Sequence, residues 1–290
     1  MKATQIYIII MSMTALAFTS CVKDELHDTP HPETGKIAVT ADWAARGAGI
    51  DIPASWSVAL GDYAGTETGE THTPDYLFEP GGYTLIAYNP AADITVNGTT
   101  ATVATTADGL LSPNPGWLFT SVQEVSIEAD KDHTFTAAMQ QQVRQLTLTI
   151  RPQGDSAPRI TGLECTLTGV AGSMNFATDT YGNESLVPLH FTKITEGENA
   201  GAWTATVYLL GIVGERQYLS GYVTFEDGNP QPMFIESDMT EVFNDPDAPF
   251  NGDKADPKIL STSTEVPAQA GVTATINDWT VVTSDPVEAM

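Results

Sequence analysis

The chain has 290 residues and carries 37 Asp and Glu against 12 Lys and Arg, which gives a formal net charge of −25 at pH 7. Such a surface repels phosphate backbones and anionic headgroups, which argues against nucleic-acid binding and against docking of the folded body on a membrane. The length allows one large hydrophobic core or two ordinary ones, and we expect two domains.

The start of the chain predicts export. Lys2 precedes an almost unbroken apolar run over residues 6–18, which has the length of a signal peptide and is short for a membrane-spanning helix. The four residues FTSC, ending at Cys21, resemble the lipobox of bacterial lipoproteins. We therefore expect residues 1–20 to be a lipoprotein signal peptide and Cys21 to carry the lipid, palmitate included. A plain secretory signal and an uncleaved helix are the alternatives.

The next segment, residues 21–35, is polar, acidic and proline-containing, as expected for a flexible tether. A strand follows, because apolar residues then alternate with small or polar ones in the period of a β-strand. These apolar residues are Ile37, Val39, Ala41 and Trp43. The strand is predicted to lead into a glycine-rich loop that contains Arg46.

Short strands with turn residues between them continue along the chain. The residues Asn97 and Gly98 lie between β-branched runs and predict a hairpin with a two-residue type I′ turn. No long segment has helical periodicity, so the pattern predicts an all-β protein of two β-sandwiches. We place the N-terminal sandwich at residues 36–138 and the C-terminal sandwich at residues 139–290.

Cysteine usage predicts a fold without disulfides. The chain has two cysteines, and a lipidated Cys21 would leave Cys165 without an intramolecular partner. Cys165 shares one face of a predicted strand with Leu163 and Leu167. We interpret it as a small buried apolar residue rather than a reactive thiol.

Several segments together resemble a known family. They are the lipobox, a first strand that ends in Asp42-Trp43, the strand MQQQVRQLTLTI, the segment LTGVAGSMNFATD and the terminal strand VTATINDW. In these the chain is similar to the fimbrial-subunit lipoproteins of Bacteroidetes, the fimbrillin superfamily, and to its anchor and accessory type, associated with the FimB name. The resemblance implies two tandem transthyretin-like (Greek-key) β-sandwiches and assembly on the cell surface by strand exchange.

In that family a polymerising subunit loses its first strand to an arginine-specific protease, and a neighbour's terminal strand fills the groove, whereas anchor subunits keep the first strand. The resemblance implies that residues 37–43 are the first strand, that Arg46 is the possible cleavage site, and that residues 272–279 are the terminal strand. The strand-exchange candidates are Ile37, Val39, Ala41, Trp43, Val272, Ala274, Ile276 and Trp279. Each also has an ordinary interpretation, with Trp43 and Trp279 as core aromatics and Arg46 as a loop residue.

Recognisable catalytic chemistry is missing from the sequence. No HExxH, GxSxG, P-loop, GxGxxG or CxxC motif occurs, and the five histidines have no zinc-like spacing. One acidic loop could supply oxygen ligands to calcium, although it lacks the spacing of an EF-hand, and a solvated loop is the preferred interpretation. Its candidate ligands are Asp245, Asp247, Asp253 and Asp256.

The sequence therefore predicts a non-enzymatic, lipid-anchored outer-membrane protein without cofactors, acting on the cell surface as an anchor or accessory subunit of a fimbria. Its expected partners are other fimbrial subunits, with no nucleic acid. The alternative is a carbohydrate-binding surface lipoprotein with the same kind of body, in which Trp56, Trp117 or Trp203 stacks on sugars. A secreted glycosidase is the third and least favoured class.

Overall fold

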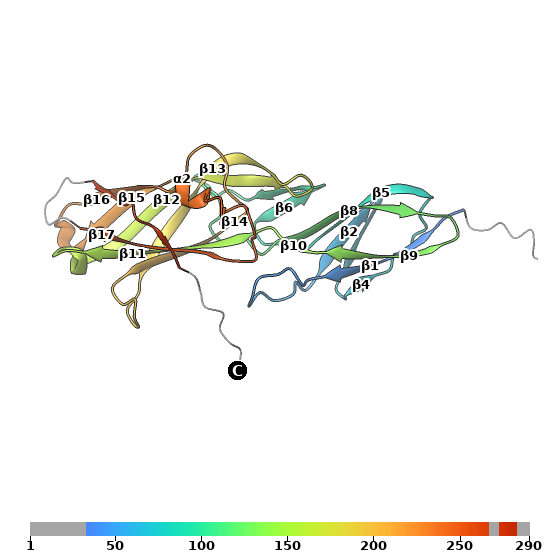
Figure 1. Ribbon diagram of the computed structural model, residues 1–290, viewed down its shortest axis with the longest axis horizontal. Coiled ribbons are helices and arrows are strands. Elements are labelled where there is room, and N and C mark those ends of the chain that lie inside the picture. The colour runs from blue at the N-terminus through green and yellow to red at the C-terminus, as the bar shows by residue number, and fades with distance from the viewer. Residues whose placement is uncertain (1–32, 267–272, 283–290) are drawn as a thin grey trace, which may run out of the picture.

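The computed structural model describes residues 33–266 and 273–282. The chain forms an elongated molecule of β-sheets, in which two bodies lie end to end (Figure 1). The predicted all-β class is confirmed. Cys21, the signal peptide, most of the tether and Val272 lie outside the described residues.

The N-terminal body is a sandwich of a three-stranded sheet, β4-β1-β9, and a five-stranded sheet, β10-β8-β5-β2-β3. Side chains from both sheets meet in one hydrophobic cluster, to which Val39, Val58 and Leu85 belong. The strands are β1 (Lys36–Asp42), β2 (Trp56–Leu60), β3 (Tyr63–Glu67), β4 (Thr71–His72), β5 (Gly81–Tyr88), β8 (Phe119–Ile127), β9 (Asp132–Ala138) and β10 (Gln140–Gln141).

Strand β1 is central to its sheet. It forms seven register pairs with β9 in parallel and two with β4 in antiparallel orientation. As the alternation in the sequence predicted, the apolar residues of this segment point into the core. Four of them are buried, and none is more than 7% exposed. They are Ile37, Val39, Ala41 and, directly after the strand, Trp43. The N-terminal core therefore depends on β1 remaining in place.

The C-terminal body is built on one continuous, eleven-stranded ladder that folds over a second and larger hydrophobic cluster. Its main path is β18-β16-β15-β12-β13-β14-β11-β17-β19. The strands are β6 (Ile94–Asn97), β7 (Thr100–Val103), β11 (Arg144–Gln153), β12 (Ile160–Asn175), β13 (Thr180–Lys193), β14 (Trp203–Leu209), β15 (Tyr218–Phe225), β16 (Met233–Asp238), β17 (Lys258–Glu265), β18 (Ala274–Thr275) and β19 (Thr280–Val281). Cys165 lies inside this cluster, 5% exposed, without a disulfide.

The β6–β7 hairpin leaves the N-terminal body and joins the C-terminal one. Strand β7 pairs with the end of β12, and Ala101 and Val103 are buried in the larger cluster. The hairpin was predicted, but its turn is shifted by one residue, since Asn97 pairs with Thr100 and the two-residue loop is Gly98 and Thr99. Of these two only Gly98 has a positive φ, of 58°, which fits a type II′ turn and not the type I′ turn expected.

This hairpin means that no single cut in the sequence separates the two hydrophobic clusters. The division into residues 36–138 and 139–290 stays a prediction. Trp117, which follows the hairpin, is partly buried against both clusters. The two bodies are thus joined through shared packing as well as through the connecting chain.

Helical structure is confined to short turns in the described part of the chain: η2 (Ala157–Arg159), η3 (Glu226–Gly228) and α2 (Thr240–Phe243). None of these described helices has the length and apolar character needed to cross a membrane.

Truncation of Val103 tests the contribution of the hairpin. Val103→Ala removes two buried methyl groups, so we expect the C-terminal body to lose roughly 1–3 kcal/mol of stability. Hydrogen exchange should accelerate in β11 and β12 and change little in β2 and β5. Val58→Ala, at a position 1% exposed in the smaller cluster, is the matched control and should give the reverse pattern. Acceleration confined to the N-terminal body by Val103→Ala would contradict this packing.

Candidate functional site

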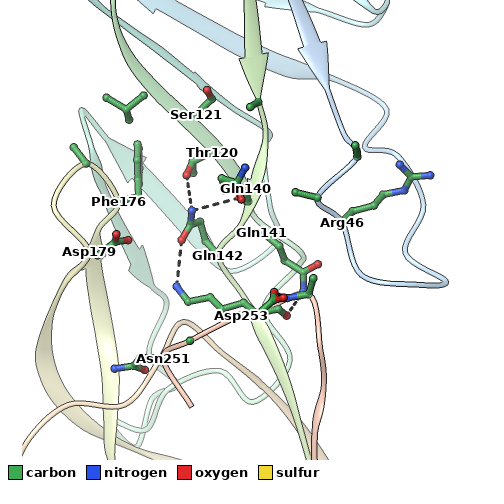
Figure 2. Close-up of a pocket in the computed structure, with 18 of the residues that line it drawn as sticks. Arg46, Thr120, Ser121, Gln140, Gln141, Gln142, Phe176, Asp179, Asn251 and Asp253 are labelled. Carbon is green, nitrogen blue, oxygen red and sulfur yellow. Dashed lines mark hydrogen bonds between the residues drawn. The ribbon is translucent and has the colours of Figure 1, made fainter. Parts of the chain in front are cut away.

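A cleft with a volume of about 1150 Å³ lies between the two bodies. Three consecutive glutamines, Gln140, Gln141 and Gln142, line its centre; Arg46 lies on one side, and Phe176 and Asp179 on the other (Figure 2). The lining is mostly polar, and several of its groups are already hydrogen-bonded to one another. We call the contacts between the bodies at this cleft the seam.

Gln141 connects three segments at the seam. Its side-chain amide donates to the carbonyl of Val143, at 2.8 Å, and to that of Lys254 in the C-terminal body, at 2.7 Å. Its Oε1 accepts from the backbone N–H of Gly47, at 2.8 Å. Because Gln141 is only 7% exposed, loss of this side chain would leave buried polar groups without partners.

The loop with the predicted cleavage site is held at the seam. The Arg46 side chain turns back on its own loop, with Nε donating to the carbonyl of Ile50 and Nη1 to that of Trp43, both at 3.0 Å. Gly47 is buried, and a Cβ atom there would lie 2.5 Å from the carbonyl oxygen of Ala255. The bond between Arg46 and Gly47 therefore lies against the C-terminal body.

The acidic loop that was considered for calcium is organised by buried cations. Arg144 donates from Nε to the carbonyl of Asp256, at 2.7 Å, and from Nη1 to the carbonyls of Pro249 and Phe250, at 2.9 Å. Lys258 Nζ donates to the carbonyl of Ala248, at 2.9 Å. Backbone carbonyls of the loop thus point to cations of the protein.

The aspartates of this loop make local contacts instead of converging. An Asp245 carboxylate oxygen accepts from the N–H of Asp247, and an Asp253 oxygen accepts from the N–H of Ala255, each at 3.0 Å. Within residues 33–266 and 273–282, no group of three or more His, Cys, Asp or Glu side chains is placed to hold a metal ion. Asp245, Asp247, Asp253 and Asp256 therefore form no such group.

Burial lowers the pKa of the cations. The pKa of Lys254 falls to about 8, mainly through desolvation; Asp179 partly opposes this fall, and Arg144 adds a smaller lowering effect. Its Nζ lies 3.2 Å from Gln142 Oε1 and 5.1 Å from the centre of the Tyr181 ring. Desolvation also lowers the pKa of Arg144 and Lys258. The three cations are thus buried at a desolvation cost, which their hydrogen bonds to carbonyl and amide oxygens offset.

Sequence reasoning did not identify these cations, although the sequence contains a signal for two of them. Arg144 occupies the strand face of Leu146 and Leu148, and Lys258 occupies that of Leu260. A cation on an apolar strand face must find buried acceptors, so its position in the alternation is informative. Gln141 and Lys254 lie outside any such alternation.

The end of the described chain corrects the predicted terminal strand. Residues 272–279 were expected to form one strand, but β18 covers only Ala274–Thr275, and Trp279 lies outside any strand. The chain crosses instead from one edge of the C-terminal ladder to the other: β18 pairs with β16, and β19 pairs with β17. Each end forms two register pairs. The predicted single strand is divided in two because both edges of the ladder, β16 and β17, lie within reach of this short segment.

Between its two ends the segment is fixed by side chains. Ile276 is 2% exposed and belongs to the larger cluster. Its carbonyl accepts from Ser237 Oγ, at 2.6 Å, and Trp279 Nε1 donates to that hydroxyl oxygen of Ser237, at 2.8 Å. Trp279 therefore packs against the core, as its ordinary interpretation expected. We call residues 273–282 the terminal segment.

The tryptophans considered for sugar stacking face inward. Trp56 is 2% exposed and Trp203 is 5% exposed. Trp117 is partly buried, and its ring contacts that of Tyr208 edge to face, with centroids 4.8 Å apart. None of the three presents an open platform.

The sequence matches the family of Fimbrillin-A associated anchor proteins Mfa1 and Mfa2 over residues 61–285, well over half of the chain. The chain belongs to this family. The expected resemblance to Bacteroidetes fimbrial subunits is thereby confirmed. The match covers β17 and the terminal segment as well as most of the N-terminal body. None of the curated proteins matches the sequence.

Solved structures of low identity share the fold. The fimbrial anchor protein Mfa2 from Porphyromonas gingivalis aligns with a TM-score of 0.57 at 12% identity, covering 86% of this chain and 97% of that one. A candidate polysaccharide-binding protein from Bacteroides thetaiotaomicron gives 0.55 at 10% identity, covering 87% and 98%. A candidate adhesin from Bacteroides ovatus gives 0.54 at 15% identity, covering 73% and 84%.

Lys254 makes stability depend on pH in a narrow window. Its pKa of about 8 in the folded state lies below the ordinary 10.5, so above pH 8 the unfolded chain binds more protons and stability rises with pH. Burial raises the pKa of Cys165 from 9.0 to about 12, which opposes the rise from about pH 9, and that of Tyr181 from 10.0 to about 12, which opposes it from about pH 10. We expect the free energy of unfolding to rise by on the order of 1 kcal/mol between pH 8 and 9.

Denaturant titrations at half-unit pH steps from 7.5 to 9 measure this rise. Lys254→Met should abolish it, because no proton is then released on folding at this site. Lys131→Met, at a side chain that is 57% exposed, is the control and should retain it. The same rise in Lys254→Met as in the natural chain would show that the amine is not the source.

Proposed function

We propose that this protein is an anchor or accessory subunit of a fimbria, held at the outer-membrane surface by a lipid on Cys21. Its role is structural and not catalytic. Its partners are other fimbrial subunits, which it joins by β-strand complementation: a strand of one subunit satisfies the open edge of another. Membership of the anchor family and the structure of the seam support this proposal.

The observation that carries the proposal is the burial of Gly47, the residue directly after Arg46. A protease needs its substrate extended and accessible, whereas Gly47 is packed against the C-terminal body and bonded to Gln141. Withdrawal of the Arg46 side chain would also break its two bonds to loop carbonyls. In this proposal the mature subunit keeps β1, so the position of β1 is not available to a donor strand.

Strand complementation is assigned instead to the terminal segment. It is held by two register pairs at each of two edges, whereas the neighbouring β11 and β17 form eight pairs with each other. Its release exposes the edges of β16 and β17 without breaking the pairing of β16 with β15 or of β17 with β11. A strand from a partner subunit can then restore the lost backbone hydrogen bonds.

The mass of the mature protein tests the anchor. In the outer-membrane fraction of its own host, we expect a chain that begins at an acylated Cys21, because two or three acyl chains give lasting attachment. Intact mass and N-terminal sequence measure this. Cys21→Ala should move the protein out of the membrane fraction. A mature chain that begins at Gly47 would instead mean that β1 is removed, and would contradict an unprocessed anchor.

A disulfide across the terminal segment tests strand exchange. Ser261 and Thr280 are register partners whose side-chain oxygens lie 3.0 Å apart. Antiparallel partners have Cα atoms about 4.5–5.5 Å apart, within reach of a disulfide. We expect oxidised S261C/T280C to be lost from fimbriae purified out of detergent-solubilised outer membranes, and reduction to restore it, because the locked segment cannot leave its edge.

A second pair controls for the modification itself. Thr147 and Thr206 are also register partners, with hydroxyl oxygens 3.0 Å apart, but they lie inside the seven-pair ladder of β11 and β14. Oxidised T147C/T206C should enter fimbriae as the natural chain does. Thiol titration confirms both bonds. Normal incorporation of oxidised S261C/T280C would contradict exchange at the terminal segment.

A further inference from the structure

The outer face of the C-terminal body carries four aligned side chains, one on each of four neighbouring strands. Glu164 on β12 is the register partner of His190 on β13 and of Tyr222 on β15, and Tyr222 is the partner of Phe234 on β16. Cross-strand partners share one face of a sheet. Leu163 and Cys165, which flank Glu164, face the core, so the four face outward. We call these four residues the aromatic row.

The aromatic row combines ring surface with hydrogen-bonding groups. The Tyr222 and Phe234 rings meet at 63°, with centroids 5.4 Å apart. Among the large apolar side chains of the described residues, Tyr222 and Ile52 are the most exposed, at 55% each. His190 Nδ1 contacts the Glu164 carboxylate, and these two side chains are 69% and 62% exposed.

Smaller side chains lie beside the aromatic row and leave a hollow. In the next register position on this face, Thr166 pairs with Pro188 on one side and with Ser220 on the other. The aromatic row and these residues line an open surface hollow of about 380 Å³. Small-molecule sites typically occupy about 300–1,000 Å³, so the hollow is large enough for a compact ligand.

The surroundings limit the class of ligand. Strands β12 and β15 are paired on both sides along this stretch, so these two central strands offer no open backbone edge to an added peptide strand. Phosphate and polyanions are repelled by the carboxylate of Glu164 and by a chain of net charge −25. A neutral sugar fits, because a pyranose ring has an apolar C–H face for the rings and hydroxyls for Glu164 and His190.

We infer that the aromatic row is a binding site for a neutral glycan, with the sugar ring against Tyr222 and Phe234 and its hydroxyls bonded to Glu164 and His190. Strands β15 and β16 lie at the end of the molecule away from the N-terminal body (Figure 1). The site therefore stays accessible when the N-terminal body faces the membrane. This inference goes beyond the proposed function and does not depend on strand exchange.

Binding of the purified mature chain to an array of neutral plant, bacterial and animal glycans tests the site, with titration of the strongest hit. We expect Tyr222→Ala and Phe234→Ala each to weaken binding at least roughly tenfold, since each removes one aromatic contact. Tyr222→Phe keeps the ring and should retain most of the affinity. Glu164→Gln should weaken binding to a smaller extent.

Tyr76→Ala is the matched control, because Tyr76 is 45% exposed on the N-terminal body and should not affect binding. Unchanged thermal unfolding of each variant excludes a folding defect. The inference is overturned if no neutral glycan binds, or if binding survives Tyr222→Ala. It is also overturned if Tyr222→Ala reduces incorporation into fimbriae without any glycan binding, which would assign the row to a protein contact. Failure of this test leaves the anchor proposal intact, since the disulfide experiment reads out a different segment.

Discussion

The structure depends on buried cations that are satisfied by backbone carbonyls. In a chain of net charge −25, Arg144 and Lys258 are under the acidic loop, where they bind its carbonyl oxygens. The acceptors are backbone carbonyls of the loop, which bind the two cations directly and need no carboxylate of the loop for it. The loop is thereby fixed in one conformation, and its Lys254 and Ala255 form one wall of the seam. The acidic side chains remain free to face solvent.

The acidic loop in turn fixes the position of the N-terminal body. The carbonyl of Lys254 binds Gln141, and Gln141 binds the N–H of Gly47, so two segments about two hundred residues apart are held through one side chain. The β6–β7 hairpin adds a second connection, in which a segment between strands of the N-terminal body pairs with β12 of the C-terminal body. Together they explain why the loop of Arg46 is ordered although its composition, rich in glycine and alanine, is typical of mobile segments.

Sequence alternation predicted the elements whose inner face is apolar, β1 and β11 among them. It missed β17, because the inner face of that strand is formed by Lys258, Leu260, Thr262 and Thr264, and only one of these is apolar. Eight register pairs with β11 define the strand instead. The seam could not be predicted for a similar reason: Gln141 and Lys254 acquire their partners from segments distant in sequence. The crossing of the terminal segment likewise depends on where two edges lie in space.

The two ends of the described chain, β1 and the terminal segment, are attached with different strength. This difference decides which end can be released more easily. Release of β1 would break seven pairs with β9 and expose three strand residues and Trp43 from a core that has no substitute for them. Release of the terminal segment would break two pairs at each edge and one hydroxyl network centred on Ser237, and it would expose one core residue, Ile276, and the buried part of Trp279. The free energy of opening grows with the hydrogen bonds broken and the apolar area exposed to water, so the end after β17 opens first. For the proposed anchor, tethered ahead of β1, the membrane-facing body would therefore stay closed while the other end is open to the proposed strand exchange.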